Sequence, residues 1–186
     1  MILTASNENQ MIRLMSKQPK PKDVIETFIN DIRSVRHSPR FQIIVTHGVL
    51  ELLVNTLVEQ TCKHQEKIIE STRDFPHAVK LVLLSEKGII NDSQFKFIDN
   101  FRKLRNSAAH GAQFVLKEEM LKPFANLNAV RNPAYHDVKT KLEKLCEFLV
   151  IGFWNANKGS FEIAFKPEVV ADKIKHQLIM NSLRPL

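Results

Sequence analysis

The sequence predicts an all-α protein, a helical bundle of about five to seven helices. Apolar residues recur at intervals of three and four in several long stretches, which is the spacing of helices that pack on a core. The 186 residues include five glycines and one tyrosine, and no short strands recur at regular spacing, which argues against a sandwich or a barrel. A chain of this length suits one domain with a sizeable core.

Composition divides the chain into three regions. Residues 1–21 are polar and end in Pro19-Lys20-Pro21, so we expect a flexible N-terminal arm. Residues 22–156 are expected to form the helical domain. Residues 157–186 are expected to be a C-terminal extension that packs on the same domain.

The longest helical pattern covers residues 41–69, which contain no proline. Its first half is apolar on so many sides that we expect burial on more than one face, as for the central helix of a bundle. Its second half, residues 63–70, is charged and expected to project into solvent. A shorter helix is expected before it, at residues 23–35, and is broken by Ser38-Pro39.

A polar stripe interrupts this apolar helix. Glu51, Asn55 and Glu59 recur every four residues and so share one face. The preferred interpretation is a solvated seam; the alternative is that Glu51 faces a polar pocket or a dimer seam. His47 lies one turn before Glu51, within reach of a hydrogen bond, although a lone histidine of this kind is more often a core group with a partner than a ligand.

Residues 91–111 are predicted to form a helix packed on the core. Asn91 begins it, because its side chain accepts hydrogen bonds from free backbone N–H groups. Gly111 is expected to end it in the left-handed conformation that glycine tolerates. Its apolar stripe consists of Phe97, Ile98, Phe101, Leu104 and Ala108.

The remaining elements are expected to be shorter. These are a helix at 78–86 that ends with Gly88, an extended segment at 112–115, a helix at 117–127 interrupted at Pro123, a long helix at 135–155, a lone strand or extended tail at 159–165, and a terminal helix at 167–180.

Charge and cysteine content restrict the class of protein. The net charge of +7 leaves an anionic partner open, yet the basic residues are scattered, so a well-solvated basic surface is the preferred interpretation of charge alone. Cys62 and Cys146 lie far apart, which predicts two buried free thiols and neither a metal site nor a disulfide framework. We expect no cofactor, no signal peptide, no membrane span and a cytoplasmic location.

Candidate chemistry gathers at the end of the helix at 91–111. Arg105 can hold two phosphate oxygens at once, and His110 can take a proton from a hydroxyl or return one to a leaving group. Asn106 can orient the imidazole or bind an oxygen. Such a set cleaves RNA without a metal, because the 2′-hydroxyl is an internal nucleophile, and it leaves a 2′,3′-cyclic phosphate. The neighbouring Arg102 and Lys103 are candidates for contacts with RNA phosphates.

Helical geometry sets a condition on this site. Five residues of an ideal helix turn through about 500°, so Arg105 and His110 should point roughly 140° apart. They converge if the helix unwinds before Gly111 or if a second subunit supplies a matching set. The structural alternative is an Arg-Asn pair that caps a helix end beside a histidine favoured by the helix dipole.

The segment Leu104-Arg-Asn-Ser-Ala-Ala-His-Gly111 resembles the signature of the HEPN superfamily. The resemblance implies an all-α bundle that dimerises across this helix and, in active members, a metal-independent endoribonuclease of toxin, antiphage or RNA-processing systems. It also implies that Arg105 stabilises the phosphate, that His110 is the acid-base group and that Asn106 is the accompanying polar residue. Glu51 is a weaker correspondence, since the family places a polar residue there only variably.

The overall pattern is similar to the mannitol operon repressor family, which is itself HEPN-like. The apolar helix at 41–58, the turn at 84–91 and the segment 114–127 carry the likeness, which spans about residues 40–150. This resemblance implies a non-catalytic regulator or adaptor that acts through protein partners. The sequence shows no helix-turn-helix with a basic recognition helix, so direct binding of operator DNA is not expected.

A second match to the same short pattern, Arg131-Asn-Pro-Ala-Tyr-His136, is rejected because a proline-broken turn lacks the packing that would position the pair. The sequence therefore predicts a HEPN-like homodimer that handles RNA, with Arg105 and His110 at a composite site on the two-fold axis. A cognate antitoxin or a regulatory protein is a further expected class of partner.

Overall fold

The computed structural model describes residues 21–111, 113–166, 168–170 and 172–173, and these contain helices and no strand. The all-α prediction is confirmed. The helices are α2 (Pro21–Ser34), α3 (Pro39–Thr61), α4 (Gln65–Glu70), α5 (His77–Glu86), α6 (Asp92–His110), the 3₁₀ helix η1 (Glu118–Phe124), α7 (Asn128–Arg131), α8 (Val138–Ala156) and α9 (Lys158–Ala164). Residues 1–20 of the expected arm at 1–21 and most of the expected helix at 167–180 lie outside the described residues, and Pro21 is the first residue of α2.

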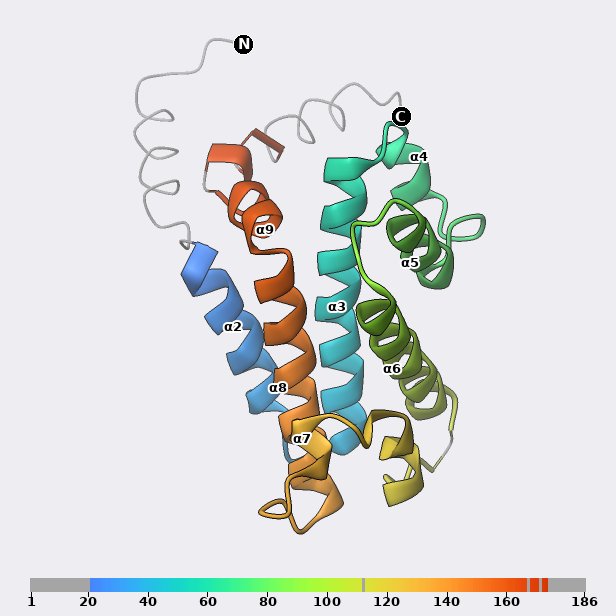
Figure 1. The fold of residues 1–186 in the computed structure, drawn as a ribbon, viewed down its shortest axis with the longest axis vertical. Coiled ribbons are helices and arrows are strands. Elements are labelled where there is room, and N and C mark those ends of the chain that lie inside the picture. Colours follow the sequence, from blue (N-terminus) through green and yellow to red (C-terminus); the bar gives the residue numbers. More distant parts are fainter. Residues whose placement is uncertain (1–20, 112, 167, 171, 174–186) are drawn as a thin grey trace, which may run out of the picture.

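Helix α3 is the centre of the bundle (Figure 1). It packs against α2, α4, α5, α6, α8 and α9. In Figure 1, α8 and α2 lie on one side of α3 and α5 and α6 on the other, with η1 and α7 at one end. Leu50, Leu53 and Leu57 of α3 are fully buried, which agrees with the dense apolar pattern of the first half of this stretch.

The apolar character of α3 comes from its place in the core. By length and composition alone it could cross a membrane, with a mean hydropathy of 1.6, but 61% of its most apolar window is buried inside the bundle. The core helix of a soluble protein has the same properties, so this one helix is weak evidence for a membrane span.

The expected continuous helix at 41–69 is wrong, because α3 ends at Thr61 and α4 begins at Gln65. Cys62 leaves the helix with extended backbone, and its N–H is donated to the carbonyl of Val58. The hydroxyl of Thr61 donates to the carbonyl oxygen of Leu57 at 2.6 Å, a local bond that competes with helix propagation. No glycine or proline marks this break in the sequence. Cys62 is only half-buried, whereas Cys146 is fully buried and burial raises the pKa of its thiol to about 12.

The expected strand or extended tail at 159–165 is also wrong, because these residues belong to α9 and its C-terminal cap. Phe161 and Phe165 lie four residues apart and both stack on Trp154, with ring centroids at 5.2 and 5.7 Å. The period-two alternation was misleading because Ile163 is exposed to solvent rather than on the buried face with its neighbours.

The start of α6 follows the prediction and its end does not. The side chain of Asn91 accepts from the backbone N–H of Gln94, and the side chain of Gln94 accepts from that of Asn91, forming a capping box. Gly88 precedes this turn with a φ of 68°, the left-handed conformation that favours glycine. Gly111, however, is extended, with a φ of −74°. A Cβ at Gly111 would approach the Ser107 carbonyl oxygen to 3.2 Å, so a close backbone approach explains the glycine there.

Replacing Phe101 by alanine is expected to lower the free energy of unfolding by about 3–5 kcal/mol, because a fully buried ring is removed from the core. Phe101 also packs edge-to-face on Phe124 with centroids at 6.3 Å. Urea denaturation followed by circular dichroism measures the change. The matched control is Phe41→Ala, whose ring is 58% exposed, and equal losses in the two variants would contradict the described packing.

Candidate functional site

A cavity of about 290 Å³ lies where α3, α5 and α6 meet. Its polar walls come from all three helices and from the loop before α5. The lining residues are His47, Glu51, Thr72, Phe75, Pro76, His77, Ala78, Lys80, Arg102, Arg105 and Asn106. The volume lies at the small end of the range for ligand pockets, about 300–1,000 Å³, so it suits a small polar group.

Two buried histidines form one wall. His47 Nε2 and His77 Nδ1 are 3.1 Å apart, with the rings edge to face. His47 Nδ1 lies 3.8 Å from the Glu51 carboxylate, which favours a proton on that nitrogen. His47 Nε2 is then the acceptor and His77 Nδ1 the donor. His77 Nε2 is consequently unprotonated, and it is buried without a hydrogen-bond partner.

Both histidines are held neutral. Burial, followed by the positive charges of Arg105 and Arg102, lowers the pKa of His47 to about 4. Burial, then the neighbouring His47, and then Arg102, Lys80 and Arg105 lower the pKa of His77 to about 3. An imidazolium here would be deprived of water and placed beside cations, so the neutral ring is preferred at neutral pH.

Lys80 contributes a buried ammonium group to the same cavity. Its Nζ donates to Asn55 Oδ1 at 2.9 Å, and the residue is only 2% exposed. Burial lowers the pKa of Lys80, and the negative charge of Glu51 opposes that shift. Glu51 therefore lines a polar cavity, in line with the alternative that the sequence left open for this residue, while Asn55 accepts from Lys80.

Helix α6 supplies two arginines, one paired with a carboxylate and the other bonded to an uncharged amide. Arg102 is held by Asp99, with its Nε and Nη2 at 2.9 and 2.8 Å from Oδ1. Lys103 also pairs with Asp99 and lies outside the cavity lining. Arg105 donates from Nη1 to Asn106 Oδ1 at 3.2 Å, and within the described part of the chain it makes no ion pair with a carboxylate.

His110 lies apart from this cavity. It is the exposed last residue of α6 and is not among the cavity-lining residues. The neighbouring Ala109 carbonyl accepts from Arg40 Nη2 at 3.0 Å, so this end of α6 meets the first turn of α3. Arg40 and His47 are about 10 Å apart along the axis of α3. The single chain therefore brings Arg105 and Asn106 together with His47 and Glu51, but it does not bring Arg105 to His110.

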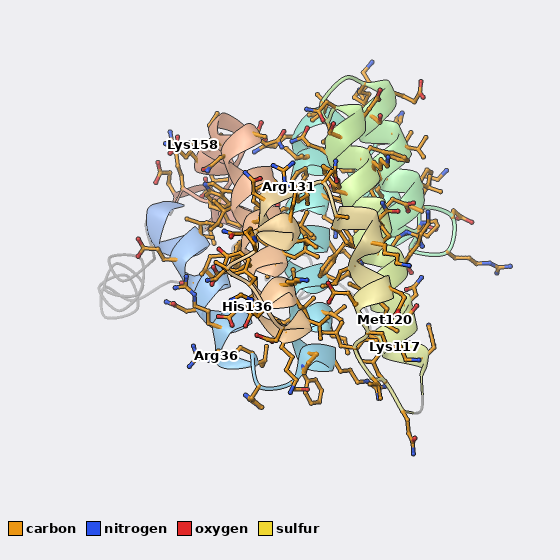
Figure 2. The ribbon with its side chains drawn as sticks, turned by 60° about the horizontal axis from the view of Figure 1, so that its bottom comes forward. Arg36, Lys117, Met120, Arg131, His136 and Lys158 are labelled. Atoms are coloured by element: carbon orange, nitrogen blue, oxygen red, sulfur yellow. The ribbon has the colours of Figure 1, made fainter. Side chains whose placement is uncertain are left out.

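The second match to the short pattern, Arg131 and His136, lies on the surface. Figure 2 shows Arg131 on α7 and His136 in the turn that leads to α8, at the end of the bundle that faces the viewer. Both are exposed, and Arg131 donates to Asn128 Oδ1 at 3.0 Å. This local bond explains the residue without a function.

Sequence reasoning missed His77 and Lys80, although a signal was present. His77, Lys80, Leu81 and Leu84 are the buried residues of α5, and they follow the i, i+3, i+4, i+7 pattern of a core-facing stripe. Two titratable residues on such a stripe predict a buried polar cluster. Among the described residues, no group of three or more metal-ligating side chains could hold a metal ion.

Comparisons of the chain with family models, curated proteins and solved structures found no match. The HEPN resemblance therefore stays a hypothesis that depends on the residues themselves.

The stability of the protein is expected to fall between pH 7 and pH 5. The unfolded histidines bind protons near pH 6.5 while the folded pair does so only near pH 3–4, so the unfolded state binds more protons in this window. We expect a loss of about 2 kcal/mol for each histidine and about 4 kcal/mol for the two together. Urea denaturation at a series of pH values measures it.

The control for this pH effect is the double variant His47→Gln/His77→Gln, compared with the exposed His136→Gln. The double variant should show a flatter pH dependence, whereas the single surface variant should follow the wild type. A wild-type stability that stays constant from pH 7 to pH 5 would show that the pair is not buried and neutral.

Proposed function

We propose that this protein is a HEPN-like, RNA-handling protein of the cytoplasm that acts as a metal-independent endoribonuclease. The observation that carries the proposal is the projection of Arg105 and Asn106, the first residues of the motif, from α6 into a cavity that also holds His47 and Glu51. Arginine is suited to the phosphodiester because its planar guanidinium binds two oxygens and stays charged.

In the proposed reaction, Arg105 stabilises the charge that develops on the phosphate oxygens. A nitrogen of the His110 imidazole, the acid-base group of the motif, removes the proton of the 2′-hydroxyl. The 2′-oxygen bonds to phosphorus, and the bond between phosphorus and the 5′-oxygen breaks. The 5′-oxygen then receives a proton from the protonated nitrogen. The products are a 2′,3′-cyclic phosphate and a 5′-hydroxyl, and no metal takes part.

The position of His110 makes a homodimer part of this proposal. Since His110 is exposed and does not line the cavity of its own chain, a partner subunit would have to bring its own His110 near Arg105 for the two to act together. Among the described residues, no exposed large apolar side chain belongs to α6. An interface across α6 would therefore be mainly polar, and it would depend on charged residues such as Lys96 and Lys103 that α6 exposes.

A second function is favoured by the same exposure of His110. A non-catalytic regulator or adaptor, as in the mannitol operon repressor family, needs the fold but no converging Arg-His pair. Its exposed apolar side chains lie elsewhere, for example Phe148 and Ile151 on α8. In this case the partner would be a protein, such as a cognate antitoxin or a regulatory protein.

The deciding test is cleavage of a panel of RNAs in EDTA. Wild-type protein is expected to give products with cyclic phosphate ends, and Arg105→Ala should lower the rate by at least about a hundredfold, because a charge-stabilising donor is removed. His110→Ala should have a comparable effect if a partner subunit supplies that group. Gel electrophoresis of end-labelled RNA and end analysis provide the measurement.

The matched control is Arg131→Ala, which removes an exposed arginine from the rejected second match. It should cleave like the wild type. Absence of cleavage by a folded protein over the whole panel would favour the regulator or adaptor, and cleavage that survives both Arg105→Ala and His110→Ala would exclude this site.

A further inference from the structure

We propose that the cavity between α3, α5 and α6 binds an oxyanion of the phosphate class beside Arg105, and that the His47–His77 pair takes up one proton as the anion enters. This inference rests on the proposed function only for the choice of phosphate as the ligand class. It does not require that RNA be cleaved.

The charges of the cavity are the first argument for an anion. Arg102, Arg105 and Lys80 contribute three positive charges to its lining, and Glu51 is the only carboxylate among the lining residues. Asp99 neutralises Arg102 from outside the lining. Arg105 and Lys80 are hydrogen-bonded to amide oxygens, Asn106 Oδ1 and Asn55 Oδ1, which carry no charge. The cavity thus holds a positive excess in a partly buried place, where a bound anion is strongly favoured.

The unpartnered nitrogen of His77 is the second argument. His77 is 8% exposed, lines the cavity, and leaves Nε2 without a hydrogen-bond partner. A buried polar group without a partner is costly in a native protein. A proton on this Nε2 would convert the ring to an imidazolium, whose positive charge beside the cavity attracts an anion. Without a bound anion that proton is disfavoured, because Arg102, Arg105 and Lys80 are near.

Anion entry reverses this balance. A negative charge beside the imidazoles offsets the repulsion from the two arginines and from Lys80, so it favours the protonated form. The other charged groups that bear on the pair are Glu51, which faces His47, and Asp99, which lies behind Arg102. By linkage, a site that gains a proton on binding holds the anion more tightly as the pH falls.

The test uses sulfate, because it has the shape of phosphate and does not itself titrate near neutral pH. Isothermal titration calorimetry of the full chain at pH 6, in buffers with different ionisation enthalpies, gives the number of protons exchanged from the slope of observed enthalpy against buffer enthalpy. We expect uptake of about one proton for each sulfate bound. Affinity should fall as the pH rises to 8.

Three variants separate the parts of the proposal. Arg105→Gln should weaken sulfate binding about tenfold or more. His77→Asn should bind without proton uptake and with little dependence on pH. Arg131→Gln, which removes an exposed charge from outside the cavity lining, should behave as the wild type. Nitrogen-15 spectra of the histidine rings in the wild type report protonation directly, even if His77→Asn does not fold.

A short 2′-O-methylated RNA distinguishes a nucleic-acid phosphate from a free oxyanion, because it cannot be cleaved through its 2′-oxygen. If this RNA binds with proton uptake and sulfate displaces it, the cavity is a site for RNA. If only sulfate binds with proton uptake, the cavity is a site for a free oxyanion. Absence of sulfate binding, binding without proton uptake, or equal affinity in wild type and Arg105→Gln would each overturn the inference. None of these outcomes depends on ribonuclease activity, which the cleavage assay reports separately.

Discussion

The contact between His47 and His77 is the constraint on which the packing of α3, α5 and α6 depends. His47 lies on the central helix, where most neighbours are apolar, and an unpaired imidazole there would be costly. His77 meets it from the first residue of α5 at 3.1 Å. This bond fixes the rotation of α5 about its axis, which then directs Lys80 towards Asn55 on the same face of α3. Two polar contacts, one turn apart on α5, thus set the orientation of one helix on another.

Periodicity and capping signals predicted the fold well where local sequence decides structure. Asn91, Gln94 and the apolar stripe through Phe101 specify both the start and the buried face of α6. The break at Cys62 escaped prediction because hydroxyl and backbone bonds end α3 without glycine or proline. The helix at residues 159–165 escaped prediction because both a period-two and a helical spacing fit these residues. The contact with Trp154 decided between the two, and no local pattern contains that contact.

The candidate site was predictable only in part, for a similar reason. Arg105 and Asn106 were selected from the motif, and helix geometry alone indicated that His110 would point elsewhere. The groups that surround Arg105 come from α3 and α5, and the packing of these helices against α6 depends on tertiary contacts that local sequence does not show. Polar residues on an otherwise apolar stripe, such as Lys80, were the only local evidence of that neighbourhood.

The neutrality of the two histidines and the charge of Arg105 are not independent features. If His47 were charged and no anion were bound, it would repel Arg102 and Arg105 across the α3–α6 contact, so the close packing of these helices favours neutral imidazoles. Arg105, in turn, donates to the uncharged amide of Asn106 and makes no ion pair among the described residues. A negative group in the cavity would satisfy both demands at once, since it attracts Arg105 and permits a proton on the pair. Such a ligand should therefore draw α3, α5 and α6 together rather than separate them.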